Sequence, residues 1–108
     1  MMNIDLIVVD DHPLVLSGFE HILSGQDGVV LRATFSGAEA AMEYLRDHSV
    51  DVILLDINMP EIDGFQALHY FQSKHPDIQV IAISNLKEAS VANRMLQSGA
   101  SGYLLKNV

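Results

Sequence analysis

Three aspartates, one serine and one lysine in this sequence each follow a short apolar run. Asp10 and Asp11 come after the first run, and Asp56, Ser84 and Lys106 each come directly after another. Phosphoryl transfer needs such groups, because a carboxylate can attack phosphorus while an ammonium and a hydroxyl offset charge on the phosphoryl oxygens. Carboxylates without cysteine also favour a hard cation, and Mg²⁺ fits best because it takes few protein carboxylates and leaves room for phosphate oxygens. The residue types therefore predict Mg²⁺-dependent phosphoryl transfer to an aspartate.

Asp56 is the predicted nucleophile of this set. It stands alone after its apolar run, whereas Asp10 and Asp11 are adjacent and have the arrangement of a metal-holding pair. Lys106 would neutralise charge on the transferred group, and Ser84 would donate a hydrogen bond to it. An isolated aspartate in such a place is more often a helix or turn cap. Here three other segments are predicted to converge with it, so we favour the nucleophile.

His12 lies directly beside the acidic pair, and an imidazole can bind a metal ion. At the predicted start of a helix, however, such a residue is more often a surface or capping side chain. We expect that role for His12. The other four histidines are scattered without the spacing of metal ligands.

Five apolar runs are predicted to be strands of one parallel sheet. They lack in/out alternation, as expected for strands covered on both faces, and they alternate with stretches of helical spacing, which is typical of βα units. The runs are Leu6–Val9, Val29–Leu31, Val52–Leu55, Val80–Ile83 and Tyr103–Leu105. An open parallel sheet binds its ligand beyond the carboxyl ends of its strands, where strand order reverses. We therefore expect a doubly wound α/β fold with one polar site at that edge.

Four stretches between the runs have apolar residues at helical spacing, and each predicts a helix with one buried stripe. The stripes are Val15, Phe19 and Ile22; Ala38, Ala41, Met42 and Leu45; Phe65, Leu68 and Phe71 within residues 63–74; and Ala92, Met95 and Leu96 within residues 89–98. Ser36 and Glu39 have the spacing of a capping box. Pro13 suits the first turn of a helix, because its missing N–H would have no partner there. The turn from Met59 to Gly64 should shape the site rather than react.

The composition limits the classes of function. A chain of 108 residues fits one domain. Its formal charge of −8 would repel a polyanion, so this domain alone should not bind nucleic acid. It has no cysteine, its apolar runs are far shorter than the ~20 residues that span a bilayer, and no basic, hydrophobic leader precedes the first run. We expect a cytoplasmic location and no membrane segment.

The sequence ends two residues after Lys106, before a helix could follow the last predicted strand. One face of the sheet would then be under-covered, and exposed apolar surface of that kind invites association. Dimerisation, exchange of elements between copies and an incomplete chain all fit this pattern. We favour the last: a domain over residues 1–108, truncated before its final helix and without an output domain.

Three motifs resemble the receiver domain of two-component response regulators. They are Val8-Val9-Asp10-Asp11-His12-Pro13, Leu54-Leu55-Asp56-Ile57-Asn58-Met59-Pro60 with Asp63-Gly64, and Gly99-Ala100-Ser101-Gly102-Tyr103-Leu104-Leu105-Lys106. In this order and at this spacing they are highly specific, and the similarity runs from Ile4 to Lys106. They look like the subgroup with LuxR or NarL-type output domains. The resemblance implies the flavodoxin-like receiver fold.

The resemblance also implies roles for the site residues. Asp56 would accept a phosphoryl group from a sensor histidine kinase, and Lys106 would contact that group. Asp10, Asp11 and Asp56, with the backbone carbonyl of Asn58, would hold Mg²⁺. Such a domain is not a metabolic enzyme, because it catalyses only its own phosphorylation and at most its own dephosphorylation.

By the same resemblance, Ser84 and Tyr103 would form a switch pair. Ser84 would move toward the phosphoryl group and Tyr103 would turn in behind it, biasing a pre-existing equilibrium. Receiver domains of this subgroup usually control dimerisation and a C-terminal helix-turn-helix domain. Transcription would then be regulated through DNA binding by an output domain that these 108 residues do not include.

Two other functions stay open. A phosphate-independent interaction module of the same fold would be expected to lose an acid or the lysine, whereas this chain keeps both. A Mg²⁺-dependent phosphohydrolase with an aspartyl nucleophile would share the chemistry. It would normally need a cap or insertion over its substrate, and every predicted connection here is short. A phosphorylation-dependent signalling switch is therefore the leading hypothesis.

Overall fold

The computed structural model describes residues 3–57, 64–85 and 89–106. Within them the chain alternates between strand and helix, as the apolar pattern predicted. The strands are β1 (Ile4–Val9), β2 (Val29–Phe35), β3 (Val52–Asp56), β4 (Gln79–Ser84) and β5 (Gly102–Leu105). The helices are α1 (Pro13–Ser24), α2 (Ala38–Tyr44), α3 (Gly64–Lys74) and α4 (Ala89–Gln97).

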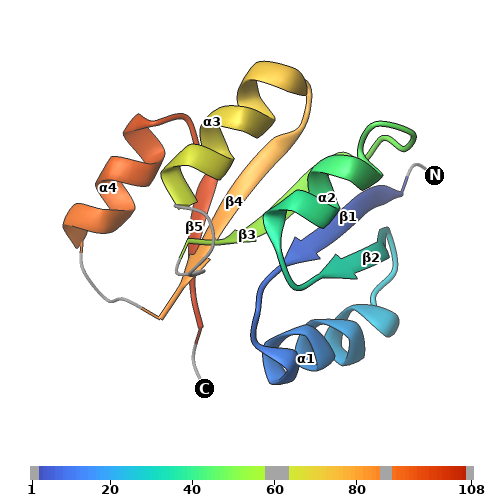
Figure 1. Ribbon diagram of the computed structural model, residues 1–108. Coiled ribbons are helices and arrows are strands. Elements are labelled where there is room, and N and C mark those ends of the chain that lie inside the picture. Colours follow the sequence, from blue (N-terminus) through green and yellow to red (C-terminus); the bar gives the residue numbers. More distant parts are fainter. Residues whose placement is uncertain (1–2, 58–63, 86–88, 107–108) are drawn as a thin grey trace.

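All five strands pair in parallel in the order β2-β1-β3-β4-β5. Helices α2, α3 and α4 cover one face of the sheet and α1 covers the other (Figure 1). The predicted doubly wound α/β fold is therefore confirmed, in its flavodoxin-like form. The order reverses between β1 and β3, because the chain goes outward from β1 to β2 and then returns to β3 on the other side. An open parallel sheet places its binding crevice at this switch point.

The core is divided by the sheet into two clusters. Along β1 and β3, Ile7 and Ile53 face the larger cluster beneath α2, α3 and α4, whereas Val8 and Leu54 face the smaller cluster. Phe71 of α3 is fully buried in the larger cluster. The central strands are thus covered on both faces, as their unbroken apolar runs indicated.

Helix α1 buries a different stripe from the one predicted. Leu16, Phe19 and Leu23 pack against the smaller cluster, whereas Ile22 of the predicted stripe is 60% exposed. Both stripes have helical spacing, so periodicity alone could not separate them. The orientation of the helix on the sheet selects the first. Pro13 begins this helix as predicted.

The predicted strand at Val29–Leu31 is confirmed, but β2 extends to Phe35 and has no fully buried residue, because it lies at the edge of the sheet. Two further local predictions are wrong. The capping box does not form, since α2 begins after Gly37 without a side-chain cap. In α4, Met95 is buried as expected but its neighbour Leu96 is 46% exposed. In each case the position of the element in the sheet, or on a face of the sheet, decided the outcome rather than the local sequence pattern.

Strand β5 carries apolar side chains to solvent. Leu104 and Leu105 are 47% and 43% exposed. Tyr103, by contrast, packs against the larger cluster.

Two glycines should respond in opposite directions to alanine. A Cβ at Gly64, the buried first residue of α3, would lie 2.6 Å from the backbone Cα of Ile57, whereas nothing lies within 4 Å of a Cβ at Gly18 in α1. Gly64→Ala should lower the free energy of unfolding by about 1–3 kcal/mol through overpacking. Gly18→Ala should raise it by up to about 1 kcal/mol through helix propensity.

Urea unfolding followed by circular dichroism would measure both glycine variants. The pair controls for side-chain size, since each change adds the same methyl group. A loss of stability at Gly18, or none at Gly64, would contradict the packing described here.

Candidate functional site

Four strands deliver the predicted site residues to one edge of the sheet. Asp10 directly follows β1, Asp56 is the last residue of β3, Ser84 is the last residue of β4, and Lys106 directly follows β5. Asp10 and Asp56 therefore flank the switch point between β1 and β3. The backbone N–H of Lys106 donates to the carbonyl of Ser84 at 2.8 Å, which anchors the lysine beside the ends of the central strands.

The lysine bridges the two buried carboxylates. Its Nζ lies 2.7 Å from Asp10 Oδ2 and 3.1 Å from Asp56 Oδ2. Both aspartates are fully buried, and the lysine side chain is only 7% exposed. Charges removed from water in this way are tolerated only when they are compensated, and Lys106 supplies that compensation for two carboxylates at once.

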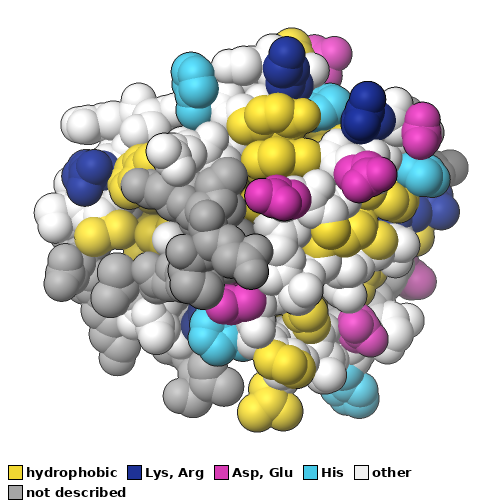
Figure 2. All heavy atoms as spheres, viewed as in Figure 1, with side chains coloured by type: hydrophobic (Ala, Val, Ile, Leu, Met, Phe, Trp, Pro, Cys, Tyr) yellow, Lys and Arg dark blue, Asp and Glu magenta, His cyan; other side chains and the backbone are white. Residues whose placement is uncertain are grey.

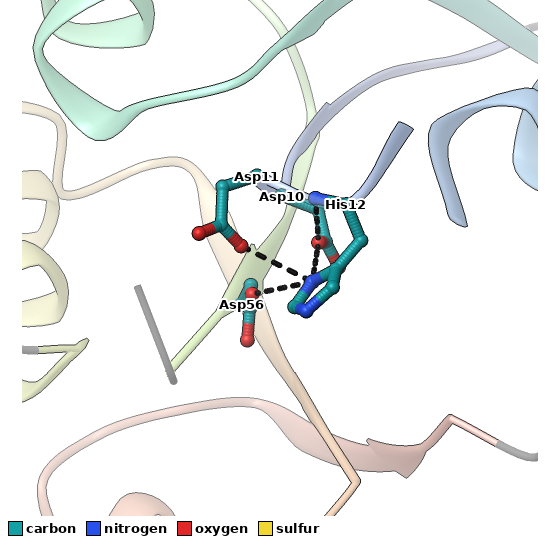
Figure 3. Close-up of side chains that lie close together, drawn as sticks. All are labelled: Asp10, Asp11, His12 and Asp56. Carbon is teal, nitrogen blue, oxygen red and sulfur yellow. Dashed lines mark hydrogen bonds and ion pairs between the residues drawn. The ribbon is translucent and has the colours of Figure 1, made fainter. Parts of the chain in front are cut away.

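Asp11 and His12 complete the cluster from the start of α1. Asp11 is partly exposed, and its Oδ1 lies 3.1 Å from Nδ1 of His12. The same nitrogen lies 2.7 Å from Asp10 Oδ1 and 3.6 Å from Asp56 Oδ2. Figure 3 shows the imidazole turned toward the three carboxylates. The ring therefore belongs to the site.

The expected surface position of His12 is confirmed, because its side chain is 52% exposed, but its ring also contacts the acidic cluster. His12 is the N-cap residue of α1, but its side chain makes no capping hydrogen bond. The ring instead lies among the acids, where an N–H can offset negative charge. The signal that could have indicated this was its position directly after two adjacent aspartates that were themselves assigned to the site.

The pKa of Asp10 is lowered by its neighbours in the site. Burial by itself would raise the pKa of Asp10, but hydrogen bonds from Lys106 and from the backbone and ring of His12 outweigh burial and hold that pKa below its ordinary value. The backbone N–H of His12 donates to Asp10 Oδ1 at 2.8 Å. Asp10 is thus kept as a carboxylate, which is the form that binds a cation.

The donor set fits a divalent metal ion. Asp10, Asp11, His12 and Asp56 each offer a ligand atom, and these atoms lie within 4.8 Å of one another. Asp10 Oδ2 and Asp11 Oδ1 are buried carboxylate oxygens, and their close neighbours are Lys106 Nζ at 2.7 Å and His12 Nδ1 at 3.1 Å. Like charges brought together this closely resist ionisation unless a cation joins them. A hard cation bound by carboxylate oxygens meets that requirement.

The comparisons with known proteins agree with this geometry. Residues 6–108 match the sequence profile of the response regulator receiver domain. The chain belongs to this family. It is 37% identical over 103 residues to the response regulator GacA of Pseudomonas syringae pv. syringae, covering 95% of this chain and 48% of that protein. It is 35% identical over 106 residues to the transcriptional regulatory protein DegU of Brevibacillus brevis, covering 98% of this chain and 45% of that protein.

A solved structure shows the same fold in this family. The signal receiver domain of NarL from Mycobacterium tuberculosis superposes with a TM-score of 0.89 at 34% identity, covering 100% of this chain and 87% of that one. The resemblance to the LuxR and NarL-type subgroup is therefore confirmed. This receiver domain spans about half the length of the curated relatives it matches. Receiver domains of response regulators act in two-component signalling and are not enzymes in the ordinary sense.

The remaining predicted site residues lie near the cluster or outside the described part of the chain. Ser84 is fully buried at the end of β4, and Tyr103 is half-buried on the neighbouring strand β5, where it pairs with Ala82. The two residues of the predicted switch pair therefore occupy adjacent strands of this receiver domain. Asn58, whose carbonyl was expected to hold Mg²⁺, and most of the turn from Met59 to Gly64 lie outside the described residues.

The face of the molecule seen in Figure 2 shows no dense cluster of acidic side chains. Acidic side chains there are scattered among apolar, basic and uncharged ones. Among the described residues, Asp10, Asp11 and Asp56 gather at the switch point with His12, and two of these acids are buried. Among the described helices of this receiver domain, none combines the length and apolar character needed to cross a bilayer.

Proposed function

We propose that this receiver domain is a phosphorylation-controlled switch in which Asp56 accepts a phosphoryl group from a sensor histidine kinase. The observation that carries the proposal is the buried Asp56 carboxylate at the switch point, with Lys106 Nζ 3.1 Å from its Oδ2. Two further carboxylates, Asp10 and Asp11, stand beside it in the place where a cation would be held. A nucleophile, a cationic group and a metal-binding pair are the parts that phosphoryl transfer to a carboxylate needs.

The transfer would be a displacement at phosphorus. A carboxylate oxygen of Asp56 forms the new O–P bond as the P–N bond of the donor phosphohistidine breaks, and the bond electrons return to the leaving imidazole, which takes a proton from solvent. Lys106 Nζ contacts the Asp56 carboxylate before the transfer. After the transfer, its ammonium would offset negative charge on the phosphoryl group. Ser84, buried at the end of the next strand, would donate its hydroxyl to a phosphoryl oxygen.

Asp10, Asp11 and Asp56 would hold Mg²⁺ together with the backbone carbonyl of Asn58. When bound, Mg²⁺ would draw negative charge from the phosphoryl oxygens. The depressed pKa of Asp10 supports this role, because the carboxylate stays ionised and can bind a cation in neutral solution.

The signal would leave the site through the switch pair. A phosphoryl group adds charge and acceptor oxygens next to Ser84, and Tyr103 on the adjacent strand would turn in as Ser84 moves. Tyr103 packs on the larger core cluster, so its movement would alter the face formed by α4 and β5. That face would control association between copies of the protein.

Transcriptional output is a proposal for the whole protein. DegU of Brevibacillus brevis is a transcriptional regulatory protein, and this receiver domain matches 45% of it. We propose that the DNA-binding function resides in a segment outside these 108 residues. The domain's own charge of −8 does not favour contact with a polyanion. Its place of action would be the cytoplasm, where a sensor kinase presents its phosphohistidine.

Intact mass after incubation with acetyl phosphate tests the proposed reaction. With Mg²⁺ the wild-type domain should gain the mass of one phosphoryl group, and with a chelator in place of Mg²⁺ it should gain none. Circular dichroism of the chelated sample would show that the fold is intact. No mass gain by a folded, Mg²⁺-bound domain would contradict the switch and favour a phosphate-independent interaction module. Sustained turnover of acetyl phosphate would favour a phosphohydrolase.

A further inference from the structure

The phosphorylation switch gives His12 no role, although the ring of His12 lies inside the carboxylate cluster (Figure 3). The side chain is 52% exposed and therefore has access to water. Its Nδ1 nevertheless lies 2.7 Å from Asp10 Oδ1 and 3.1 Å from Asp11 Oδ1. A ring placed there needs a reason beyond helix capping, because it makes no capping hydrogen bond.

The contacts of Nδ1 require a proton or a metal cation between this nitrogen and the carboxylate oxygens. A bare nitrogen lone pair facing carboxylate oxygens would be repelled, so the nitrogen must share a proton or a metal cation with them. Lys106 Nζ lies 3.3 Å from the same nitrogen and adds positive charge beside it. An imidazole held against carboxylates in this way can exchange its proton for a metal ion, since neutral imidazole nitrogen is a common metal ligand.

The atom spacing is close to that of ligands around one ion. With metal–ligand distances near 2.1 Å, neighbouring ligand atoms of an octahedral ion lie about 3.0 Å apart and opposite ones about 4.2 Å apart. Nδ1 of His12 lies 2.7, 3.1 and 3.6 Å from oxygens of Asp10, Asp11 and Asp56. All four ligand atoms fall within 4.8 Å of one another. Small adjustments of side chains would bring them to one coordination sphere.

We propose that His12 is a nitrogen ligand of this cation site and makes it select a first-row transition metal ion such as Mn²⁺ over Mg²⁺. The inference rests on the cation site of the proposed function and names a ligand and a preference for it. Imidazole nitrogen suits transition metals, whereas Mg²⁺ prefers oxygen and keeps its waters. Mg²⁺ would therefore bind through oxygen ligands, with water in the place of the ring, and Mn²⁺ would take the ring as well.

Mn²⁺ binding to the whole 108-residue domain tests this assignment. Free Mn²⁺ would be titrated by electron paramagnetic resonance, and Mg²⁺ affinity would be obtained by competition. His12→Ala should weaken Mn²⁺ binding by at least about tenfold. It should change Mg²⁺ binding by less than about threefold, because Mg²⁺ does not use the ring. His21→Ala, an exposed histidine in the last turn of the same helix, is the matched control and should change neither affinity.

A spectroscopic readout separates a ligand from a neighbour. Pulsed electron paramagnetic resonance of bound Mn²⁺ should detect coupling to a histidine nitrogen in wild type and in His21→Ala, and none in His12→Ala. Absence of nitrogen coupling in Mn²⁺-loaded wild type would overturn the proposal. Unchanged or tighter Mn²⁺ binding by His12→Ala would also overturn it, because the ring would then only occupy the place of the cation.

The outcome is independent of the phosphoryl reaction. Phosphoryl uptake with Mg²⁺ would be measured on the same samples by intact mass. If wild type binds Mn²⁺ through His12 but takes up no phosphoryl group, the metal assignment holds and the switch fails. If the domain takes up a phosphoryl group but shows no nitrogen coupling, the switch holds and the His12 assignment fails.

Discussion

Replacing Asp56 by asparagine should abolish phosphoryl uptake and, in metal-free buffer, make the domain more stable. The amide of asparagine lacks the negative oxygen that attacks phosphorus, so uptake from acetyl phosphate should fall at least about 10³-fold. Asparagine has nearly the shape of aspartate, so the buried end of β3 should keep its packing. The variant thus separates the charge of Asp56 from its volume.

The gain in stability follows from the charges around Asp56. Asp10, Asp11 and Asp56 bring three carboxylates together, and Lys106 is shared between two of them. Removing one negative charge lowers the repulsion, while Lys106 keeps its 2.7 Å contact with Asp10. A net gain of about 1 kcal/mol would raise the melting temperature by roughly 5 °C in a domain of this size.

Thermal unfolding would measure the melting temperature of each protein without Mg²⁺ and the stabilisation that Mg²⁺ adds. Mg²⁺ should stabilise wild type more than Asp56→Asn, because the variant lacks one of the carboxylate ligands. Asp47→Asn makes the same chemical change at an exposed residue and should alter neither uptake nor melting temperature. Phosphoryl uptake by Asp56→Asn at the wild-type rate would place the acceptor elsewhere. A lower melting temperature in metal-free buffer would mean that the ion pair with Lys106 outweighs the repulsion.

The fold could be predicted from the sequence because its central strands are covered on both faces. The uninterrupted apolar runs of β1, β3 and β4 have no other simple explanation, and parallel pairing brings Asp10, Asp56 and Ser84 to one edge. The site followed from that single geometric step. Its five predicted side chains at the strand ends needed no knowledge of packing beyond the direction of the strands.

The predictions failed where two local patterns were equally good. In α1, Ile22 and Leu23 both continue a helical stripe with Phe19, and only the way the helix sits on the sheet decides that Leu23 is buried. His12 is a similar case, since a helix start and an acidic neighbour favour different roles for the ring. The ring lies beside three carboxylates, where an N–H of the imidazole can offset their negative charge. Electrostatics therefore favours this position over a capping hydrogen bond.

Lys106→Met should destabilise the domain strongly at pH 7 and much less near pH 4. Methionine has a similar length but no charge, so Asp10 and Asp56 would stay buried without the ammonium that contacts both. Breaking a buried ion pair by removing one partner costs about 3–5 kcal/mol. The loss should therefore be among the largest that a single substitution causes in this domain.

The pH dependence follows from the pKa of Asp10. In wild type this pKa is depressed although burial opposes it, and Lys106 is the main group that depresses it. The stability contributed by ionised Asp10 is fully present above the pKa of an unfolded aspartate and is lost as the pH falls through the lower, folded value. Without Lys106, burial would dominate and raise the pKa of Asp10. The variant would then gain stability relative to wild type as acid protonates the carboxyl.

Urea unfolding of both proteins at pH 7 and near pH 4 would measure this difference. Lys74→Met, at an exposed position in the last turn of α3, removes the same charge without a buried partner and should cost little at either pH. An equal loss for Lys106→Met at both pH values would mean that packing of the lysine stem, rather than its charge, holds the strand ends together. A loss confined to neutral pH would show that the charge of Lys106 stabilises the ionised form of Asp10, which is the state in which Asp10 can bind a cation beside the proposed nucleophile Asp56.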